Sequence, residues 1–198
     1  MENRMNFRKL SARLFLVISL GVMKTMLAGE FVIDDRSSGN LKSNLGMEWR
    51  LVSDQVMGGV SKGNLKLDTH KGRDCLRMQG DVSTEQNGGF VQMALSDEDN
   101  FDASAFDGIV FEVAGNNEDY NIHFRTSDLW FPWQSYRAEF HATDEWQTVR
   151  IPFANFDAYK TSQKFLQRNL KRIGLVAIGR DFRFDLCLGS LRFYSVDN

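Results

Sequence analysis

Cysteine, proline and histidine are scarce in this chain of 198 residues, which holds two, two and three of them. Cys75 and Cys187 form no CxxC pair, and His70, His123 and His141 match neither HExxH nor another zinc-ligand spacing. Because a metal or catalytic site is recognised by such ligands at close spacing, the sequence predicts no metal site, no cofactor and no catalytic residues.

Nucleotide-binding glycine motifs are also missing. The pairs Gly58-Gly59 and Gly88-Gly89 resemble neither a phosphate-binding P-loop nor a GxGxxG turn that opens a helix. We therefore expect a protein that acts by binding and is not an enzyme. An enzyme would require a cleft in which a carboxylate such as Asp54 or Asp185 approaches a histidine.

A surplus of basic residues is absent as well. The chain has 24 Lys and Arg against 26 Asp and Glu, with a formal net charge of −2. Residues 1–28 hold five of the basic residues and one of the acidic residues, so residues 29–198 retain 19 basic and 25 acidic residues and a net charge of −6. Proteins that grip nucleic acid concentrate Lys and Arg. The composition therefore argues against a nucleic-acid partner.

No apolar run reaches the roughly 20 residues that a membrane-spanning helix needs. The N-terminal apolar run, residues 14–23, is about half that length; basic residues precede it, and Ala28-Gly29 follows it. This order is typical of a signal peptide. We predict that residues 1–28 are a cleaved signal peptide and that the mature protein is exported, periplasmic or secreted, without a spanning segment. An uncleaved membrane anchor and an organelle-targeting leader are the alternatives.

The two cysteines bear on the same question. In an exported protein Cys75 and Cys187 could pair, and a bridge closing so long a loop would add roughly 4 kcal/mol in the chain-entropy model. Their separation in the sequence does not show whether they meet. Paired cysteines and free thiols therefore both stay open.

Beyond residue 28 the dominant pattern is an alternation of apolar and polar side chains with a period of two. Tyr120, Ile122 and Phe124, for example, alternate with polar residues. Such alternation places apolar side chains on one face of a strand and polar ones on the other. The pattern and further apolar runs predict strands over residues 109–113, 136–140 and 182–188, and over Asn64–Leu67, Cys75–Gln79, Phe90–Leu95, Thr148–Phe153, Ile173–Ile178 and Leu191–Tyr194.

Glycine, asparagine and aspartate punctuate these runs, as expected of turns. One segment, Thr161–Leu170, is predicted to be a short helix. About ten short strands with one buried face each predict an all-β fold, in which two antiparallel sheets pack face to face as a sandwich or jelly roll. Since no internal repeat or linker interrupts them, residues 29–198 are expected to form a single domain.

Three stretches contain residues that a plain sandwich does not require. Ser53 and Asp54 lead to Gly58-Gly59, Asn87 opens a tight turn, and residues 123–136 bring an arginine close to several aromatics in the sequence. Aromatic side chains beside an arginine are typical of recognition surfaces for sugars, peptides or proteins. We predict a binding face composed of six residues: Ser53, Asp54, Asn87, Arg125, Trp133 and Tyr136.

A purely structural interpretation competes with this prediction. In it, Trp130 and Trp133 plug the open end of the sandwich, and Arg125 pairs with an acidic neighbour. The segment Lys171–Arg180, apolar with charged ends, is likewise predicted to be a buried strand with solvated ends.

Seven motifs in order resemble the complex I intermediate-associated protein 30 family, over about Phe31 to Tyr194. They are SDQVMGGVSKG at Ser53–Gly63, NGGFVQ at Asn87–Gln92, FDGI at Phe106–Ile109, HFRT at His123–Thr126, PWQSYRAEF at Pro132–Phe140, VRIPFANF at Val149–Phe156 and LKRIGLVAIGR at Leu170–Arg180. The resemblance implies a galactose-binding-domain-like β-sandwich, similar to carbohydrate-binding modules, and it implies no catalytic residues.

The resemblance also implies the role of the mitochondrial members of the family, which assist the assembly of respiratory complex I (NADH:ubiquinone oxidoreductase) without joining the finished enzyme. The partners would then be protein subunits of a membrane complex. Those members work on the matrix side, equivalent to the bacterial cytoplasm, whereas a secretory leader would place this chain on the opposite side. The alternative function is therefore an exported module that binds a carbohydrate or another small ligand on the same fold.

Overall fold

The computed structural model describes residues 29–196, without the side chains of Asn87 and Glu98, so the predicted leader lies outside the described residues. Strands and short 3-10 helices make up the regular structure of this part of the chain. In order they are β1 (Glu30–Asp34), β2 (Trp49–Ser53), η1 (Asp54–Met57), β3 (Lys62–His70), β4 (Arg73–Val82), η2 (Glu85–Asn87), β5 (Phe90–Phe101), β6 (Gly108–Ala114), β7 (Glu118–Thr126), β8 (Ser135–Ala142), β9 (Gln147–Pro152), η3 (Phe153–Asn155), β10 (Asp157–Tyr159), η4 (Gln167–Asn169), β11 (Leu170–Ile178) and β12 (Phe182–Tyr194).

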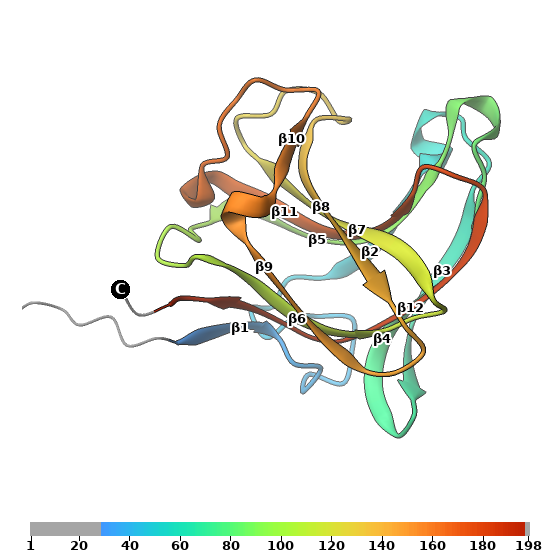
Figure 1. The fold of residues 1–198 in the computed structure, drawn as a ribbon, viewed down its shortest axis with the longest axis horizontal. Helices are drawn as coiled ribbons and strands as arrows, with labels where there is room; N and C mark the ends of the chain where they lie inside the picture. Colours follow the sequence, from blue (N-terminus) through green and yellow to red (C-terminus); the bar gives the residue numbers. More distant parts are fainter. Residues whose placement is uncertain (1–28, 197–198) are drawn as a thin grey trace, which may run out of the picture.

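The strands form two six-stranded sheets that lie face to face (Figure 1). The first, called the β12 sheet, has the order β3-β4-β12-β6-β9, and β1 also pairs with β12. The second, called the β7 sheet, has the order β10-β8-β7-β11-β5-β2. Every neighbouring pair is antiparallel. The predicted all-β, two-sheet antiparallel sandwich is therefore confirmed.

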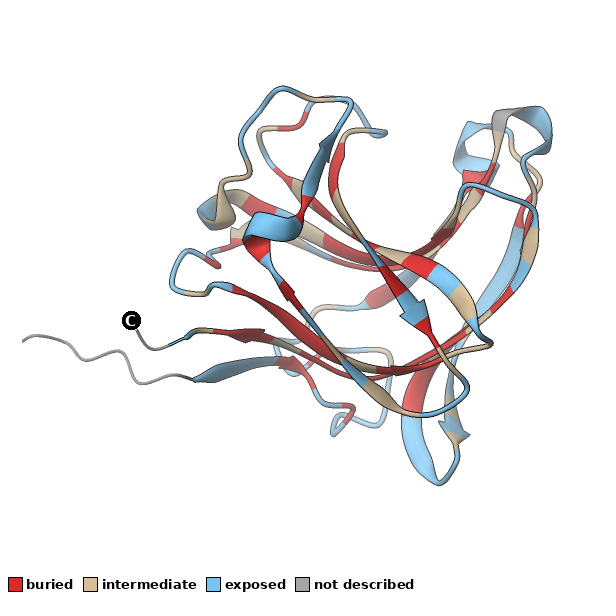
Figure 2. Cartoon of the chain, viewed as in Figure 1, coloured by how far each residue is buried: buried red, intermediate tan, exposed pale blue. Residues whose placement is uncertain are grey.

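The core lies between the sheets and is built by the predicted alternation (Figure 2). On β7, Tyr120, Ile122 and Phe124 are fully buried, whereas the polar residues between them are partly exposed on the other face. Phe124 lies in an aromatic cluster, with its ring centroid 4.4 Å from that of Phe156 and 5.5 Å from that of Phe165. Burial of one such phenylalanine contributes roughly 1.5–3 kcal/mol, which makes this cluster a main source of stability at one end of the sandwich.

Several strand predictions are confirmed, and others change. The segment Lys171–Arg180 becomes β11, which lies inside the β7 sheet between β7 and β5 and is almost entirely buried. The two strands expected over residues 182–194 are one long strand, β12, whose pairing with β6 shifts register between Leu188 and Ser190. Strands β1, β2 and β10 were not expected, because short strands at the ends of a chain or beside turns show too few alternations to stand out.

The helix predicted over Thr161–Leu170 is wrong; this stretch contains only η4 and the start of β11. Its backbone and side chains instead make tertiary contacts. The hydroxyl of Tyr136 donates to the carbonyls of Gln163 and Lys164, at 3.1 and 3.0 Å, and Phe165 packs into the aromatic cluster. An extended segment satisfies these contacts, so packing overrides the local preference.

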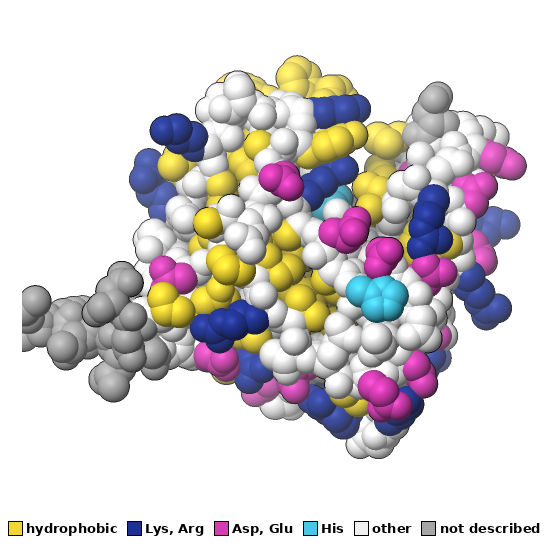
Figure 3. Space-filling view, in the orientation of Figure 1, with side chains coloured by type: hydrophobic (Ala, Val, Ile, Leu, Met, Phe, Trp, Pro, Cys, Tyr) yellow, Lys and Arg dark blue, Asp and Glu magenta, His cyan; other side chains and the backbone are white. Residues whose placement is uncertain are grey.

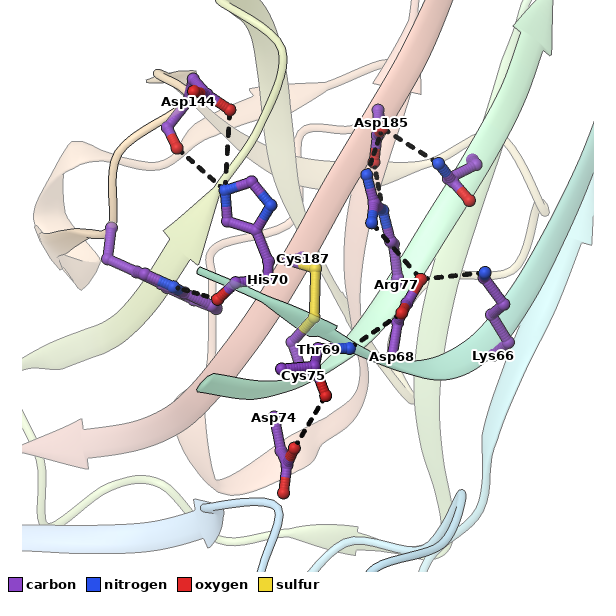
Figure 4. The surroundings of a disulfide bond; sticks show 12 residues. Lys66, Asp68, Thr69, His70, Asp74, Cys75, Arg77, Asp144, Asp185 and Cys187 are labelled. Carbon is purple, nitrogen blue, oxygen red and sulfur yellow. Dashed lines mark hydrogen bonds and ion pairs between the residues drawn. A yellow bond between two sulfur atoms is a disulfide. The ribbon is translucent and has the colours of Figure 1, made fainter. Parts of the chain in front are cut away.

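Cys75 and Cys187 form a disulfide between the neighbouring strands β4 and β12 (Figure 4). Their Cα atoms are 5.4 Å apart across a sequence separation of 112 residues. Figure 4 also shows Arg77 beside the bridge, with its guanidinium bound to the carboxylate of Asp185 at 2.7 Å. The pairing that the sequence left open is thus formed within the β12 sheet.

Candidate functional site

A groove lies on the outer face of the β7 sheet. Its cavity volume is about 710 Å³, and its floor is formed by outward-facing residues of β5, β7, β8 and β11. Loops rise on both sides of this face, and the space-filling view shows the surface hollowed between them (Figures 1 and 3). Strand alternation explains the position: residues that point away from the core on β7 necessarily point into the groove.

The first rim of the groove is aromatic. The segment between β7 and β8 carries Phe131 and Trp133, whose rings stack with centroids 4.9 Å apart and an angle of 9° between their planes. Phe131 and Trp133 are 52% and 48% exposed, and Trp130 beside them is 89% exposed. These tryptophans therefore do not plug the end of the sandwich, and the structural interpretation of them is wrong.

Arg125 holds this rim in place. Its Nη1 donates to the carbonyls of Phe131, Pro132 and Gln134 at 2.7, 2.6 and 2.9 Å, and its Nη2 donates to that of Leu129 at 3.3 Å. No acidic partner of Arg125 is present among the described side chains, contrary to the structural interpretation. Burial lowers the pKa of Arg125, but a guanidinium stays charged near neutral pH. We infer that Arg125 organises the loop through charge-assisted hydrogen bonds.

The second rim is η1, which is pinned to the turn before β5 by Asp54. The fully buried Asp54 carboxylate accepts hydrogen bonds from the amides of Ser61, Gly89 and Phe90 at 3.0, 2.6 and 3.3 Å, and from the Ser61 hydroxyl. Burial alone would raise the pKa of Asp54, but these hydrogen bonds outweigh it and lower the pKa from its ordinary value. A Cβ at Gly88 would lie 2.5 Å from the Asp54 Oδ2, so this turn requires glycine.

The floor contains polar side chains with few partners. Gln92 lies across Gly174, where an added Cβ would come within 2.6 Å of the Gln92 Oε1. His123 is opposite Gly174 in the pairing of β7 and β11, and its Nε2 has no hydrogen-bond partner among the described residues. Burial, followed by the charge of Arg137, lowers the pKa of His123 to about 3. His123 is therefore a neutral hydrogen-bonding group at physiological pH.

Two further arginines, Arg137 and Arg172, face the groove. Arg137 donates from Nε to the Ser135 hydroxyl at 2.8 Å, and its guanidinium carbon lies 3.4 Å from the ring centroid of Tyr159. Arg172 donates from Nε to the Ser96 hydroxyl at 3.0 Å. Burial lowers the pKa of both arginines. Among the described residues, neither forms an ion pair with a carboxylate.

The six residues of the predicted binding face are placed very differently. Trp133 and Arg125 line the groove. Asp54 is buried beneath the second rim, and Ser53 caps η1 by accepting from the amide of Gln55 at 3.4 Å, outside the groove lining. Tyr136 is 1% exposed and faces the core, so it is not part of the accessible face.

Asn87, the sixth predicted residue, has its backbone in η2, and its side chain lies outside the described part. Gln92, His123, Arg137, Arg172 and Tyr159 line the groove but were not predicted as site residues. The alternation around Arg137 contains a usable signal. If Tyr136 faces the core, Arg137 must face outward.

Histidine–carboxylate pairs lie away from the groove. His141 Nδ1 is 2.7 Å from an oxygen of Asp119, and His70 Nε2 is 3.6 Å from an oxygen of Asp144, near the disulfide (Figure 4). None of these four residues lines the groove. Within residues 29–196 no group of three His, Cys, Asp or Glu side chains is arranged to hold a metal ion.

The family model of complex I intermediate-associated protein 30 matches residues 40–188. The chain belongs to this family. The assignment made from the seven motifs is therefore confirmed. A search of curated proteins found no match to the chain.

Solved structures similar to this member of the complex I intermediate-associated protein 30 family include carbohydrate-binding modules. A family 11 carbohydrate-binding module from Clostridium thermocellum, in complex with a β-1,3-1,4-mixed-linked tetrasaccharide, has a TM-score of 0.66 and 16% identity, over 86% of this chain and 98% of that chain. A family 30 carbohydrate-binding module has a TM-score of 0.60 and 17% identity, over 87% of this chain and 90% of that chain.

An exo-β-agarase has a TM-score of 0.58 and 8% identity, over 86% of this chain and 26% of that chain. At these identities the likeness shows the fold, a jelly-roll sandwich like that of carbohydrate-binding modules.

In the part of the chain that the structure describes, no helix combines the length and the apolar character needed to cross a membrane.

Proposed function

We propose that this protein is a non-catalytic binding module that holds an extended oligosaccharide in the groove on the β7 sheet. The observation that carries the proposal is the groove itself, with a stacked aromatic rim beside a floor of polar groups. Sugars are bound by aromatic faces that pack against the ring, together with a few polar groups that hydrogen-bond to its hydroxyls. Trp133 and Tyr159 supply the aromatic faces, and Gln92 and His123 supply the polar groups.

The dimensions and the fold support the proposal. A cavity of about 710 Å³ is within the range of about 300–1,000 Å³ that ligand sites occupy. The structure of the family 11 module, which has the same fold, is a complex with a tetrasaccharide. The floor of the groove is built on strands in the interior of a sheet, and such elements position side chains more rigidly than free loops do.

The proposal includes export. The order of residues in the leader, with its basic start and short apolar run, matches a signal peptide. The Cys75–Cys187 disulfide is of the kind that persists in oxidising compartments. An exported protein meets polysaccharides directly, and it is separated from the cytoplasmic arm of a respiratory complex.

A glycan array with the purified protein tests the proposal. We expect binding to at least one polysaccharide, and loss of at least about fivefold in affinity when Trp133 is replaced by Ala, because a ring stacked on an aromatic side chain contributes about 1–3 kcal/mol. Trp130→Ala is the matched control, since Trp130 belongs to the same loop but does not line the groove. No binding to any glycan, or equal effects of the two substitutions, would contradict the proposal.

A second candidate function is that of an assembly factor, which binds protein subunits of a membrane complex. It is favoured by the exposed apolar side chains of Trp130 and Phe131, which belong to the segment of the first rim but do not line the groove. A pull-down from native membranes tests it, with a Trp130→Ala, Phe131→Ala double variant as control. Recovery of respiratory subunits by the native protein, and not by the double variant, would support this function through this surface, and recovery of no respiratory or other membrane subunits would count against it.

A further inference from the structure

The groove is a positively charged site on a negatively charged protein. Residues 29–198 have a net charge of −6, yet the groove is lined by Arg125, Arg137, Arg172 and Lys160 and by no described Asp or Glu. Three of these cations are arginines that are partly removed from water. Uncompensated charges in a partly desolvated site are costly, so an arrangement like this one favours an anionic ligand.

The hydrogen-bonding capacity of Arg137 and Arg172 is largely unused. Each donates from its Nε to a serine hydroxyl, and Arg137 also interacts with the side chain of Tyr159. Among the described residues, no carboxylate pairs with the terminal nitrogens of either guanidinium. The ring of Tyr159 covers the face of the Arg137 guanidinium, which leaves its in-plane N–H groups available. Arg125 differs, since its terminal nitrogens are bound to backbone carbonyls. Arg137 and Arg172 thus present the planar fork that pairs with carboxylate or sulfate oxygens.

The neighbouring acidic residues do not neutralise these arginines. Glu139 and Asp157 line a second, smaller hollow beside the groove, where Arg137 and Tyr159 also contribute to the lining. Neither forms an ion pair with Arg137. Asp157 lies opposite Arg137 in the pairing of β10 and β8, at the edge of the sheet. The acidic charge near Arg137 therefore lies at the edge of the sheet, and no described carboxylate lines the groove itself.

We propose that the groove selects an anionic oligosaccharide, whose carboxylate or sulfate groups are bound by Arg137 and Arg172. The inference rests on the proposed function, because it names the class of glycan that the site takes. The two arginines lie on β8 and β11, on either side of β7 and two residues apart along the strands, and so are roughly 12 Å apart at the backbone. A polymer that carries a charge on successive sugars can contact both arginines, while His123 and Gln92, between the rims, form hydrogen bonds with its hydroxyls.

Matched polymer pairs test the charge requirement. Homogalacturonan is compared with its fully methyl-esterified form, and dextran sulfate with dextran, since each pair shares a backbone and differs in charge. We expect one acidic polymer to bind at least about tenfold more tightly than its neutral partner and to weaken as NaCl rises from about 50 mM to about 500 mM. The pair that shows the preference identifies carboxylate or sulfate as the recognised group.

Substitutions separate a specific site from general attraction between opposite charges. Arg137→Gln and Arg172→Gln are each expected to weaken acidic-polymer binding at least about tenfold. Arg183→Gln, which removes the same charge from the exposed face of β12, is expected to change it less than about twofold. The Arg172→Lys variant keeps the charge but loses the planar fork, so its affinity for the acidic polymer should lie between those of the native protein and the Arg172→Gln variant.

The outcomes distinguish the two proposals. Equal binding of a neutral polymer and its acidic partner, or equal effects of Arg137→Gln, Arg172→Gln and Arg183→Gln, would overturn the anionic specificity and leave glycan binding intact. Binding of poly-L-glutamate as tight as that of the acidic glycan, insensitive to Trp133→Ala, would also overturn it in favour of an acidic peptide. Failure of every polymer, neutral or acidic, to bind would overturn the proposed function itself.

Discussion

Arg125 offers the sharpest test of how the groove is built, because one side chain holds the whole aromatic rim. Its terminal nitrogens donate to four carbonyls between Leu129 and Gln134, over distances from 2.6 to 3.3 Å. The substitution Arg125→Gln removes these bonds while it keeps a polar side chain of moderate length. We expect the 129–134 segment to loosen and Trp133 to lose its fixed position.

The size of the effect follows from where the carbonyls lie. One hydrogen bond to a charged group contributes about 1.5–3 kcal/mol, but the four freed carbonyls belong to an exposed loop and would be rehydrated. The net loss is therefore closer to that of one bond than of four, about 2 kcal/mol. For a domain of this size, 1 kcal/mol corresponds to about 2–4 °C in Tm, so we expect a decrease of about 4–8 °C.

Thermal unfolding followed by circular dichroism measures this change, with Arg183→Gln as the control for loss of an exposed positive charge. Amide hydrogen exchange should rise selectively within residues 129–134, and glycan affinity should fall together with it. A Tm for Arg125→Gln within about 1 °C of that of Arg183→Gln, with unchanged exchange in the loop, would refute the role given to Arg125.

Three further predictions concern stability. Hydrogen bonds hold the folded-state pKa of Asp54 below its ordinary value. The ionised Asp54 therefore stabilises the fold above about pH 4, and this stabilisation is lost as the pH falls through the folded-state pKa. The substitution Asp54→Asn should accordingly lower Tm by more at pH 7 than at pH 3. His123 has a folded-state pKa of about 3, below its ordinary value of about 6.5, so the free energy of unfolding should fall as the pH drops from about 6.5 toward 3. Urea titrations at pH 7 and pH 5 should show a smaller loss for His123→Gln than for the native protein, and an equal loss would contradict the burial of this histidine. Reduction of Cys75–Cys187, or its replacement by two serines, should cost roughly 4–5 kcal/mol in urea unfolding, and non-reducing peptide mapping should recover the linked pair.

The side-chain alternation was sufficient to predict the sandwich, because the period of two is a local property of each strand. Tyr120, Ile122 and Phe124 are in the core as expected, and Lys171–Arg180 contains the buried interior strand β11. The same alternation bears on the binding face. The prediction of Tyr136 as a binding residue rests on its aromatic ring, whereas the alternation that includes Phe140 places Tyr136 in the core and turns Arg137 outward.

Tertiary packing also determines the conformation of residues 161–170. Their composition favours a helix, yet Phe165 is held by the aromatic cluster and two neighbouring carbonyls accept from the Tyr136 hydroxyl. Asp54 illustrates the same point in a turn. It was predicted to face a partner, but its partners are the amides of Gly89 and Phe90, which lie 35 and 36 residues away in the chain.

The amino-acid sequence by itself determined that this protein is a two-sheet β-sandwich of the complex I intermediate-associated protein 30 family, because alternation and motif order are read along one chain. Only the tertiary structure decided which residues share the groove. Gln92, His123, Arg137 and Arg172 come from four strands, and their meeting depends on strand order and register, which are set by contacts between distant segments. The composition does not reveal the charge of the groove for the same reason: the chain has an excess of acidic residues, and only folding brings Arg125, Arg137 and Arg172 together in one groove.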